Sequence, residues 1–276
     1  MTRQAKATGD APARMAAPNE RGARLSSVTS AVRLLKMFSE GEAEIGVTSL
    51  ARRLGVAKST VYRMASTLVA EGMLEQNPET EKYRLGIALF ALGALVRQRM
   101  DLSNEGRPYI FDLREATNET VHLAVLDGSE IMYVYDLEST QAIRMRANLG
   151  ARRPALCTAE GRAILAFHPP ELVEPMLREG FRQRTPKTET KAETLRARLE
   201  EVRELGYARE DEQSELGMRS IAAPVRDSTG LVVGAVGMAG PLQRLSNETL
   251  ARYAPLVVET ANVISIRLGY KTRANY

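Results

Sequence analysis

The sequence predicts an α+β protein in two parts, and three observations carry this prediction. Two helical patterns end at Gly55 and Gly72 and are followed by a hairpin pattern, which is typical of a small winged helical domain. Beyond residue 100, alternating strand patterns joined by tight turns are interspersed with helical segments, as in an α+β domain with antiparallel strands. The length of 276 residues fits about two domains.

The cysteine and histidine content limits the chemistry of the chain. A single cysteine, Cys157, cannot form an intramolecular disulfide, and with only His122 and His168 beside it a Cys/His zinc cluster is excluded. The N-terminus lacks the apolar core of a signal peptide, and the longest apolar stretch, 87–96, is too short to span a bilayer. We therefore expect a cytoplasmic protein with no metal, no cofactor and no contact with a membrane.

Basic side chains concentrate near the N-terminus. The first hundred residues carry 15 Lys and Arg against 9 Asp and Glu, whereas the remainder carries 23 against 25. Between residues 47 and 70 there are four basic side chains and no acidic one. Such a patch favours a polyanion, because nucleic acid releases its counterions when basic groups replace them. A solvated helical face is the alternative.

The N-terminal elements follow from apolar spacing and from glycine stops. Residues 1–24 are rich in Ala, Pro, Arg and Gly and show no periodicity, so we expect a disordered tail. A helix is expected to begin at Ser27 and to end at residues 40–41. Its apolar face comprises Val28, Ala31, Val32, Leu34, Leu35 and Phe38. The next elements are helices over 48–54 and 58–71 and hairpin strands over 73–76 and 82–85.

The stretch from Val47 to Ser66 meets the requirements of a helix-turn-helix. In this motif the apolar residues of two helices face each other, a small residue lies where the helices touch, and a turn residue has a positive φ angle. Ala51 is the small residue, and Gly55 is the turn residue. The inward-facing set comprises Leu50, Leu54, Val56, Val61 and Met64.

The opposite face of the second helix carries hydrogen-bond donors and cations, which suit the base edges and phosphates of double-stranded DNA. Lys58, Ser59 and Thr60 lie at the helix N-terminus, where backbone N–H groups also favour phosphate. For Lys82 and Arg84 of the hairpin, or wing, ordinary strand-surface charge is an equal alternative. For the whole motif, the alternative is an exposed helical hairpin in another small domain. The predicted DNA-binding residues are Arg52, Lys58, Ser59, Thr60, Tyr62, Arg63, Lys82 and Arg84.

After the wing, the sequence predicts a linker helix and a larger domain. The helix over 87–100 is strongly apolar in its first two turns, so we expect it to contact a second copy of the chain and to transmit conformational change. The expected strands of the domain are 120–126, 130–137, 142–147, 220–226 and 231–239. Its expected helices are 161–167, 171–178, 190–205 and 245–268. The predicted divisions after the tail are therefore 25–86, 87–100 and 101–276.

Over about residues 25–270 the chain resembles the IclR family of bacterial transcriptional regulators. The N-terminal match is 51–72, followed by 83–86 (YRLG). In the C-terminal part, 119–124 (ETVHLA) and 157–166 (CTAEGRAILA) resemble two motifs of the family. Four further blocks follow in the family's order, at 184–188, 206–208, 217–225 and 240–241.

The resemblance implies a GAF-like effector domain with an antiparallel sheet, a homodimer or homotetramer, and control of a catabolic operon by a small organic acid or aromatic metabolite. A dimer would place two recognition helices on successive major grooves, which predicts a pseudo-palindromic operator. Repression and activation use the same parts and both stay open. The effector-binding positions of the family correspond to Met145, Ala159, Glu160, Gly161, Glu210, Ser220, Gly237 and Ala239.

Several of these positions depart from the family's pattern. Glu160 places a carboxylate where small residues are common, and Arg162 replaces the usual Lys. Gly237 and Ala239 stand where carboxylate-binding members can offer Ser hydroxyls. We therefore expect an effector that is larger or less anionic than glyoxylate-like acids, such as an aromatic or amide-bearing compound. A buried carboxylate needs a partner, and Arg162 is a candidate partner of Glu160, although neighbouring helix positions point in different directions.

The sequence offers little for catalysis. Cys157 is the obvious nucleophile, and a thiol-dependent redox enzyme with a fused DNA-binding module is the alternative function. No second cysteine is present to resolve an oxidised thiol, and a reactive thiol would need an electropositive site. A DNA-binding scaffold that responds to no ligand is a second alternative. We therefore expect a ligand-responsive transcriptional regulator and not an enzyme.

Overall fold

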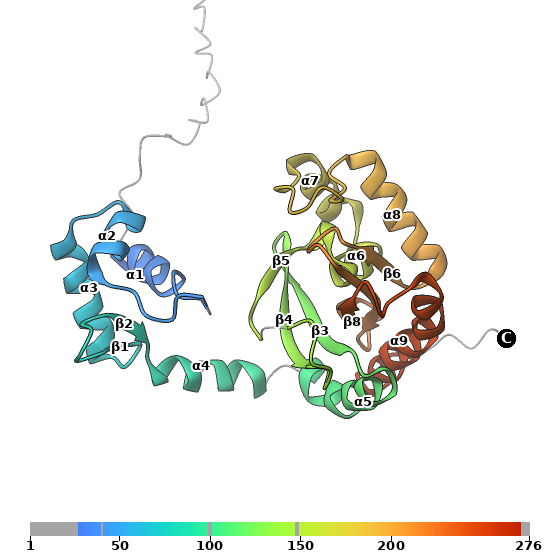
Figure 1. The fold of residues 1–276 in the computed structure, drawn as a ribbon, viewed down its shortest axis with the longest axis horizontal. Coiled ribbons are helices and arrows are strands. Elements are labelled where there is room, and N and C mark those ends of the chain that lie inside the picture. The colour runs from blue at the N-terminus through green and yellow to red at the C-terminus, as the bar shows by residue number, and fades with distance from the viewer. Residues whose placement is uncertain (1–26, 40, 99–100, 147–148, 272–276) are drawn as a thin grey trace, which may run out of the picture. The chain divides into compact units, whose positions relative to one another are not determined.

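The computed structural model describes residues 27–39, 41–98, 101–146 and 149–271, so the expected tail lies outside the described residues. It contains two compact units, Met1–Leu95 and Val96–Tyr276 (Figure 1). The boundary between the units falls within α4 (Ile87–Gln98), and the expected domain limits at residues 86 and 100 stay predictions. Among the described residues, no helix combines the length and the apolar character needed to cross a membrane.

The first unit confirms the predicted order of helices and hairpin strands. Gly55 ends the second helix with a φ of 67°, the left-handed conformation expected at the turn. The wing gains an unexpected third segment, because the backbone of Ile45 exchanges two hydrogen bonds of 2.9 Å with that of Tyr83. The elements are α1 (Ser27–Leu35), α2 (Val47–Leu54), α3 (Lys58–Ala70), β1 (Leu74–Gln76) and β2 (Tyr83–Leu85).

The core of the first unit contains the inward-facing set of the motif. Leu50 and Val61 are fully buried, and the other three members are partly buried against them. The expectation for α1 is only partly correct: Leu34 is buried, but Val28 and Val32 are 73% and 45% exposed. The helix also ends at Leu35 and not at residues 40–41. Part of the apolar face of α1 is thus not covered by the other described residues of its unit.

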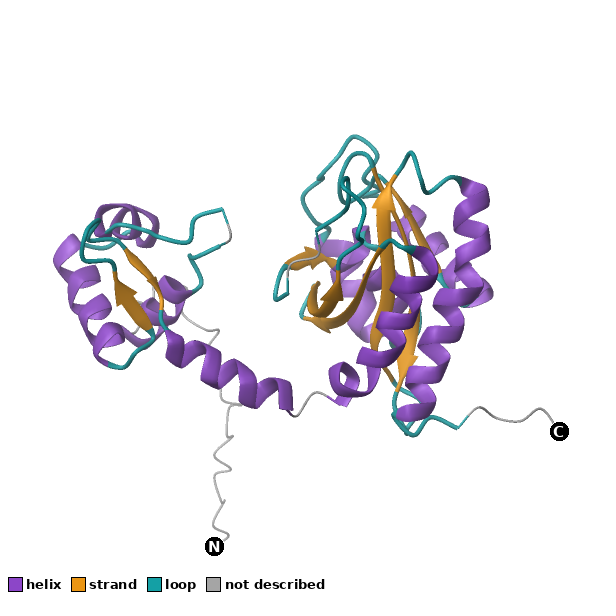
Figure 2. Ribbon diagram, turned by 60° about the horizontal axis from the view of Figure 1, so that its bottom comes forward, coloured by secondary structure: helices purple, strands orange, loops and turns teal. Residues whose placement is uncertain are grey.

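The second unit is a six-stranded antiparallel sheet with helices on both faces (Figure 2). Its strands follow the spatial order β5-β4-β3-β8-β7-β6. They are β3 (Thr120–Asp127), β4 (Glu130–Leu137), β5 (Arg152–Pro154), β6 (Ala208–Asp211), β7 (Met218–Arg226) and β8 (Val232–Pro241). The helices are α5 (Asp101–Thr117), α6 (Ala159–Leu165), α7 (Pro170–Glu179), α8 (Ala192–Leu205) and α9 (Asn247–Arg267), with a 3₁₀ turn, η1 (Ala155–Cys157), before α6.

The strands alternate between two cores because successive side chains point to opposite faces of a sheet. Val121 and Leu123 of β3 pack with α5 and α9, whereas Ala124 packs on the other side with α6, α7 and α8. Gly161 lets α6 approach closely, since a Cβ at this position would collide with the backbone of Ala155. The close approach is therefore between α6 and η1, the 3₁₀ turn that precedes it.

Three expectations for this unit were incomplete or wrong. The described residues of 142–147 form bends and coil, and the strand beside β4 is β5 instead. Helix α5 was not predicted from the sequence, because Gly106 and Pro108 interrupt its apolar spacing. No bounds were assigned to β6, a four-residue edge strand too short for a clear alternation. The other expected strands and helices are present, and none of their ends is shifted by more than two residues.

Candidate functional site

The predicted DNA-contacting residues of α3 lie on its solvent-facing side. Val61 and Ala65 are fully buried, and because successive helical residues turn by about 100°, Ser59 and Arg63 lie opposite them. Ala57 precedes the helix and offers no side-chain cap to the first backbone N–H groups. All five predicted residues of the helix are exposed: Lys58, Ser59, Thr60, Tyr62 and Arg63.

The cations of this face are not neutralised within the unit. Among the described residues, no carboxylate forms an ion pair with Arg52, Lys58 or Arg63, whereas the neighbouring Arg53 pairs with Glu42 at 2.6 Å. Arg52 is exposed on α2. The three cations are therefore available to an external anion, and their contact with DNA stays a prediction.

The two wing cations differ in their surroundings. Arg84 lies opposite Glu75 in the hairpin register and pairs with it at 2.8 Å. Lys82 is exposed, and no ion pair joins it to a carboxylate in the described part of the unit. The structure thus leaves Lys82 as the freer of the two cations.

The eight predicted effector-binding residues meet on the sheet face under α6. Glu210 lies opposite Ser220, Ser220 opposite Ala239, and Ala239 opposite Thr120. Directly opposite residues of antiparallel strands share one face. The Thr120 hydroxyl donates a 2.6 Å hydrogen bond to the carbonyl of Met145, which brings that residue to the same place. The register thus gathers residues from four separate segments, and the N-terminal half of α6 supplies Ala159, Glu160 and Gly161.

Glu160 occupies the space that Gly237 leaves free. A Cβ at Gly237 would collide with the Glu160 carboxyl group. His122 lies opposite Gly237 in the register, and its Nε2 is 2.5 Å from Glu160 Oε1. The Nδ1 atom of His122 is buried and has no hydrogen-bond partner among the described residues. The centre of this face therefore holds a buried imidazole–carboxyl pair and not an open hydroxyl-lined pocket.

The expectation that Arg162 pairs with Glu160 is wrong. Two positions apart on α6, the side chains diverge by about 200°, so they point to different sides of the helix. Arg162 donates instead to the side-chain oxygen of Gln213 and, at 2.5 Å, to the carbonyl of Arg209. The Arg162 side chain therefore makes its contacts at the edge of the sheet, beside β6.

Glu210 is a buried carboxyl group with an unusual proton affinity. It accepts backbone hydrogen bonds from Gln213 and Ser214 at 2.6 and 2.9 Å and a bond from the Ser220 hydroxyl at 3.0 Å. Burial raises its pKa to about 7, and these hydrogen bonds and the nearby charge of Arg162 only partly oppose that rise. Glu210 can therefore change its protonation state near neutral pH.

A small cavity of about 30 Å³ lies at this face, and we call it the central cavity. This space suits one or two water molecules. Of the predicted residues only Met145 and Ala239 line it, beside Thr120, His122, Tyr133 and Arg153. These last four were not predicted from the sequence. Strand alternation could have found Thr120 and His122, which share the face of Ala124. The adjacent cations Arg152 and Arg153 could indicate a clamp for an anionic ligand, although surface charge is the simpler interpretation, and nothing local pointed to Tyr133.

Cys157 does not have the surroundings of a reactive thiol. It is buried, and its thiol contacts the carbonyl of Pro154 at 3.4 Å. Burial raises the pKa of the Cys157 thiol to about 11, against which nearby arginine charges are the smaller effect. The thiolate needed for nucleophilic or redox chemistry is therefore disfavoured. Within the described chain, no three His, Cys, Asp or Glu side chains are grouped so as to hold a metal ion.

Comparison with known proteins identifies both units. Residues 27–78 match the IclR helix-turn-helix domain, and residues 94–266 match the C-terminal domain of bacterial IclR transcriptional regulators. The chain belongs to the IclR family. It is 37% identical over 248 residues to the HTH-type transcriptional regulator KdgR of Escherichia coli K12, which covers 89% of this chain and 94% of that protein.

Solved structures of IclR-type proteins have the same fold. A transcriptional regulator from Silicibacter sp. TM1040 matches with a TM-score of 0.78 and 30% identity, over 91% of this chain and 99% of that one. An IclR homologue from Microbacterium hydrocarbonoxydans, crystallised with 4-hydroxybenzoate, matches with a TM-score of 0.77 and 27% identity, over 88% and 99%. The chain is therefore a ligand-responsive DNA-binding transcriptional regulator of this family, and not an enzyme.

Proposed function

We propose that this IclR-family regulator binds a pseudo-palindromic operator as a dimer or tetramer and controls a catabolic operon, in the cytoplasm where that DNA lies. The exposed face of α3 carries the first part of the proposal, because its polar residues point outward and its cations have no ion-pair partner in the described part of the chain. A helix of this kind fits the major groove, with its N-terminal residues next to bases and phosphates.

Arg63→Ala tests the proposed DNA-contacting face. Arg63 lies opposite the buried anchors of α3, so its removal should eliminate one base or phosphate interaction and weaken operator binding by about tenfold. The measurement is a gel shift with the full chain, alongside calorimetry of effector binding, which should not change. Arg196→Ala, an exposed arginine of α8, is the matched control. Equal operator affinity in the Arg63 variant and the parent would refute the proposed face.

The apolar surface of α4 supports assembly with a second copy. Ile87, Phe90 and Leu92 are 73%, 71% and 49% exposed. The helix directly follows the wing, and two half-sites require two recognition helices held at a fixed spacing. We therefore propose the α4 helix of a second copy as the occupant of this surface. Phe90→Glu should reduce the molar mass measured by light scattering, whereas Leu231→Glu, at a similarly exposed apolar residue outside α4, should not.

The arrangement at Gly237 supports the proposed effector class. The Glu160 carboxyl group occupies the position where a hydroxyl would otherwise meet a small carboxylate, and it adds negative charge. An aromatic or amide-bearing effector, larger or less anionic than glyoxylate-like acids, fits this better; the Microbacterium relative was crystallised with an aromatic acid, 4-hydroxybenzoate. Calorimetry with 4-hydroxybenzoate and with succinate tests the proposal. Tight binding of succinate that is unaffected by Gly237→Ser would contradict it.

The size of the central cavity bears on the mechanism of response. At about 30 Å³ it cannot hold an aromatic ring without rearrangement, so the effector must favour a conformation with a larger cavity. A ligand changes operator affinity only if it binds one conformation better than another. We propose that α4, which contains the boundary between the two units, transmits this change.

A further inference from the structure

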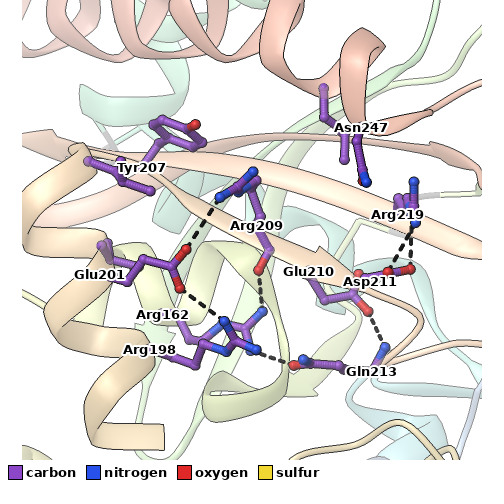
Figure 3. Close-up of a pocket in the computed structure, with 13 residues that line it drawn as sticks. Arg162, Arg198, Glu201, Tyr207, Arg209, Glu210, Asp211, Gln213, Arg219 and Asn247 are labelled. Carbon is purple, nitrogen blue, oxygen red and sulfur yellow. Dashed lines mark hydrogen bonds and ion pairs between the residues drawn. The ribbon is translucent and has the colours of Figure 1, made fainter. Parts of the chain in front are cut away.

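A second and larger cavity lies at the outer edge of the sheet, beside β6. We call it the edge cavity; its volume is about 180 Å³, about six times that of the central cavity. It lies among α8, β6 and the N-terminus of α9 (Figure 3). Four guanidinium groups and three carboxyl groups line it: Arg162, Arg198, Arg209 and Arg219, with Glu201, Glu210 and Asp211. One of the three carboxyl groups, Glu210, is partly protonated near neutral pH.

Arg162 is the unusual member of this lining. It is 1% exposed, and its hydrogen-bond partners are the neutral oxygens of Gln213 and of the Arg209 carbonyl. Among the described residues no carboxylate lies within ion-pair distance of it. Burial lowers the pKa of Arg162; the nearby charges of Glu210 and Glu189 oppose this effect, and the charge of Arg198 adds to it. A buried cation with no carboxylate in direct contact is costly, so an anion that accepts hydrogen bonds from Arg162 would be favoured.

The two outer arginines already hold an oxyanion. Glu201 of α8 accepts from Arg198 at 3.0 Å and from Arg209 at 3.3 Å, so its carboxylate bridges them. Arg198 is also held by Glu189, which accepts hydrogen bonds from it at 2.8, 3.1 and 3.2 Å. Arg219 donates two hydrogen bonds, of 2.9 and 3.1 Å, to the carboxylate of Asp211. The geometry of Arg198 and Arg209 thus suits an oxyanion, while no ion pair links the Glu201 carboxylate to Arg162.

We propose that the edge cavity binds a small molecule through a phosphate group, held by Arg162, Arg198 and Arg209. These three arginines belong to α6, α8 and β6 and line the same cavity, and Figure 3 shows the Glu201 carboxylate between Arg198 and Arg209. A tetrahedral phosphate can accept hydrogen bonds from three such directions, whereas a planar carboxylate has two oxygens to offer. The ring of Tyr207 and the side chain of Leu250 provide apolar walls for the rest of the molecule.

Gln213 connects the two cavities. Its side chain accepts from Arg162 in the edge cavity, and the next residue, Ser214, lines the central cavity. The backbone N–H groups of Gln213 and Ser214 both donate to the Glu210 carboxyl group. The preceding residue, Glu212, has a φ of 54°, a conformation that costs energy outside glycine. A phosphate that binds Arg162 competes with Gln213, so its binding should alter the wall of the central cavity; this coupling rests on the proposed function.

Calorimetric titration of the full chain with inorganic phosphate, at constant ionic strength, tests the site directly. Arg198→Gln should weaken phosphate binding by about tenfold, the loss expected for one charge-assisted hydrogen bond. Glu201→Gln should strengthen binding, because it removes the internal carboxylate that competes for the same two arginines. Arg196→Gln is the matched control, since Arg196 lies on α8 but pairs with Glu174 and lines a different cavity.

Two results would overturn the site. One is the absence of phosphate binding to the parent and to Glu201→Gln at millimolar concentration. The other is equal affinity in the parent, Arg198→Gln and Arg196→Gln. Thermal unfolding of each variant without phosphate shows whether it is folded; Arg162→Lys, which keeps the positive charge, provides a second weakened variant if Arg198→Gln does not fold.

The coupling is tested by operator binding with and without phosphate, again at constant ionic strength. We expect phosphate to shift the operator affinity of the parent, and Arg198→Gln to need about ten times more phosphate for the same shift. Failure of the proposed function would abolish operator binding while leaving the calorimetric phosphate signal. Failure of the coupling alone would leave operator binding intact and independent of phosphate.

Discussion

The exposed face of α3 and the sheet face under α6 are built in opposite ways. On α3, Lys58 and Arg63 are exposed and have no ion-pair partner among the described residues. Under α6, Glu160 and Glu210 are 2% and 1% exposed, and each is hydrogen-bonded within the unit. The first surface can bind a large polyanion without rearrangement, whereas the second must exchange internal contacts for those of a ligand.

This difference suits one face to DNA and the other to a selective response. Exposed cations release only counterions when they meet phosphate, which favours rapid and salt-dependent binding. A buried network resists change until a ligand offers equivalent partners, which makes the response selective. Variants at the buried carboxyl group, at the helix above it and at the wing therefore test the contrast in turn.

The largest effect is expected for the pH dependence of stability. The pKa of Glu210 is about 7 in the folded protein, above its ordinary value, so the folded state holds a proton that the unfolded state has released between about pH 4.5 and 7. The unfolding free energy should therefore fall as pH rises through this window, by up to about 3 kcal/mol. Glu210→Gln should remove that slope.

Urea unfolding of the parent and of Glu210→Gln, on both sides of the window, makes this measurement. Asp211 and Glu212 provide no competing effect in this window. Hydrogen bonds with Arg219 and Lys187 lower the pKa of their carboxyl groups, so the stability that depends on their ionised form is lost only at lower pH. Identical pH slopes in the two proteins would show that Glu210 is ionised throughout, and would contradict the description of this face as a closed network.

A smaller effect is expected from Gly161→Ala. The added Cβ would collide with the backbone of Ala155, so α6 must move away from η1, at a cost of about 2 kcal/mol. Gly93→Ala in α4 is the matched control: nothing lies within 4 Å of its added Cβ, and the change should be neutral or stabilising. Thermal unfolding compares the two. If Gly161→Ala is as stable as the parent, the close contact between α6 and η1 does not hold α6 in place over the sheet.

The smallest effect distinguishes the two wing cations. Lys82→Ala should reduce the salt dependence of operator binding. The slope of the logarithm of the binding constant against the logarithm of the salt concentration should become smaller by about 0.9, because one DNA phosphate is no longer neutralised. Arg84→Ala should change the slope less, because Glu75 already holds the Arg84 guanidinium. Operator affinities measured over a series of salt concentrations provide both slopes. A larger change for Arg84→Ala would mean that DNA displaces Glu75.

Much of the fold was predictable because its determinants are local. Glycine stops at Gly55 and Gly72 and the apolar spacing of α2 and α3 specified the helix-turn-helix, and strand alternation with tight turns specified the pairs β3–β4 and β7–β8. Where local patterns were weak, as in α5 with its Pro108 and in β6, the prediction failed. Residues 142–147 have an alternating pattern, but the described residues among them form no strand, and β5 takes the place beside β4.

The face of α3 follows from the sequence alone, because helical periodicity relates each outward residue to buried anchors within four positions of it. The partners of Glu160 and Arg162 could not be found in this way. They are His122 of β3 and Gln213 beyond β6, which lie 38 and 51 residues away and are brought close only by the sheet register and by α6. Side chains of opposite charge two positions apart in a sequence diverge on a helix, so tertiary packing, and not proximity along the chain, decided which groups became partners.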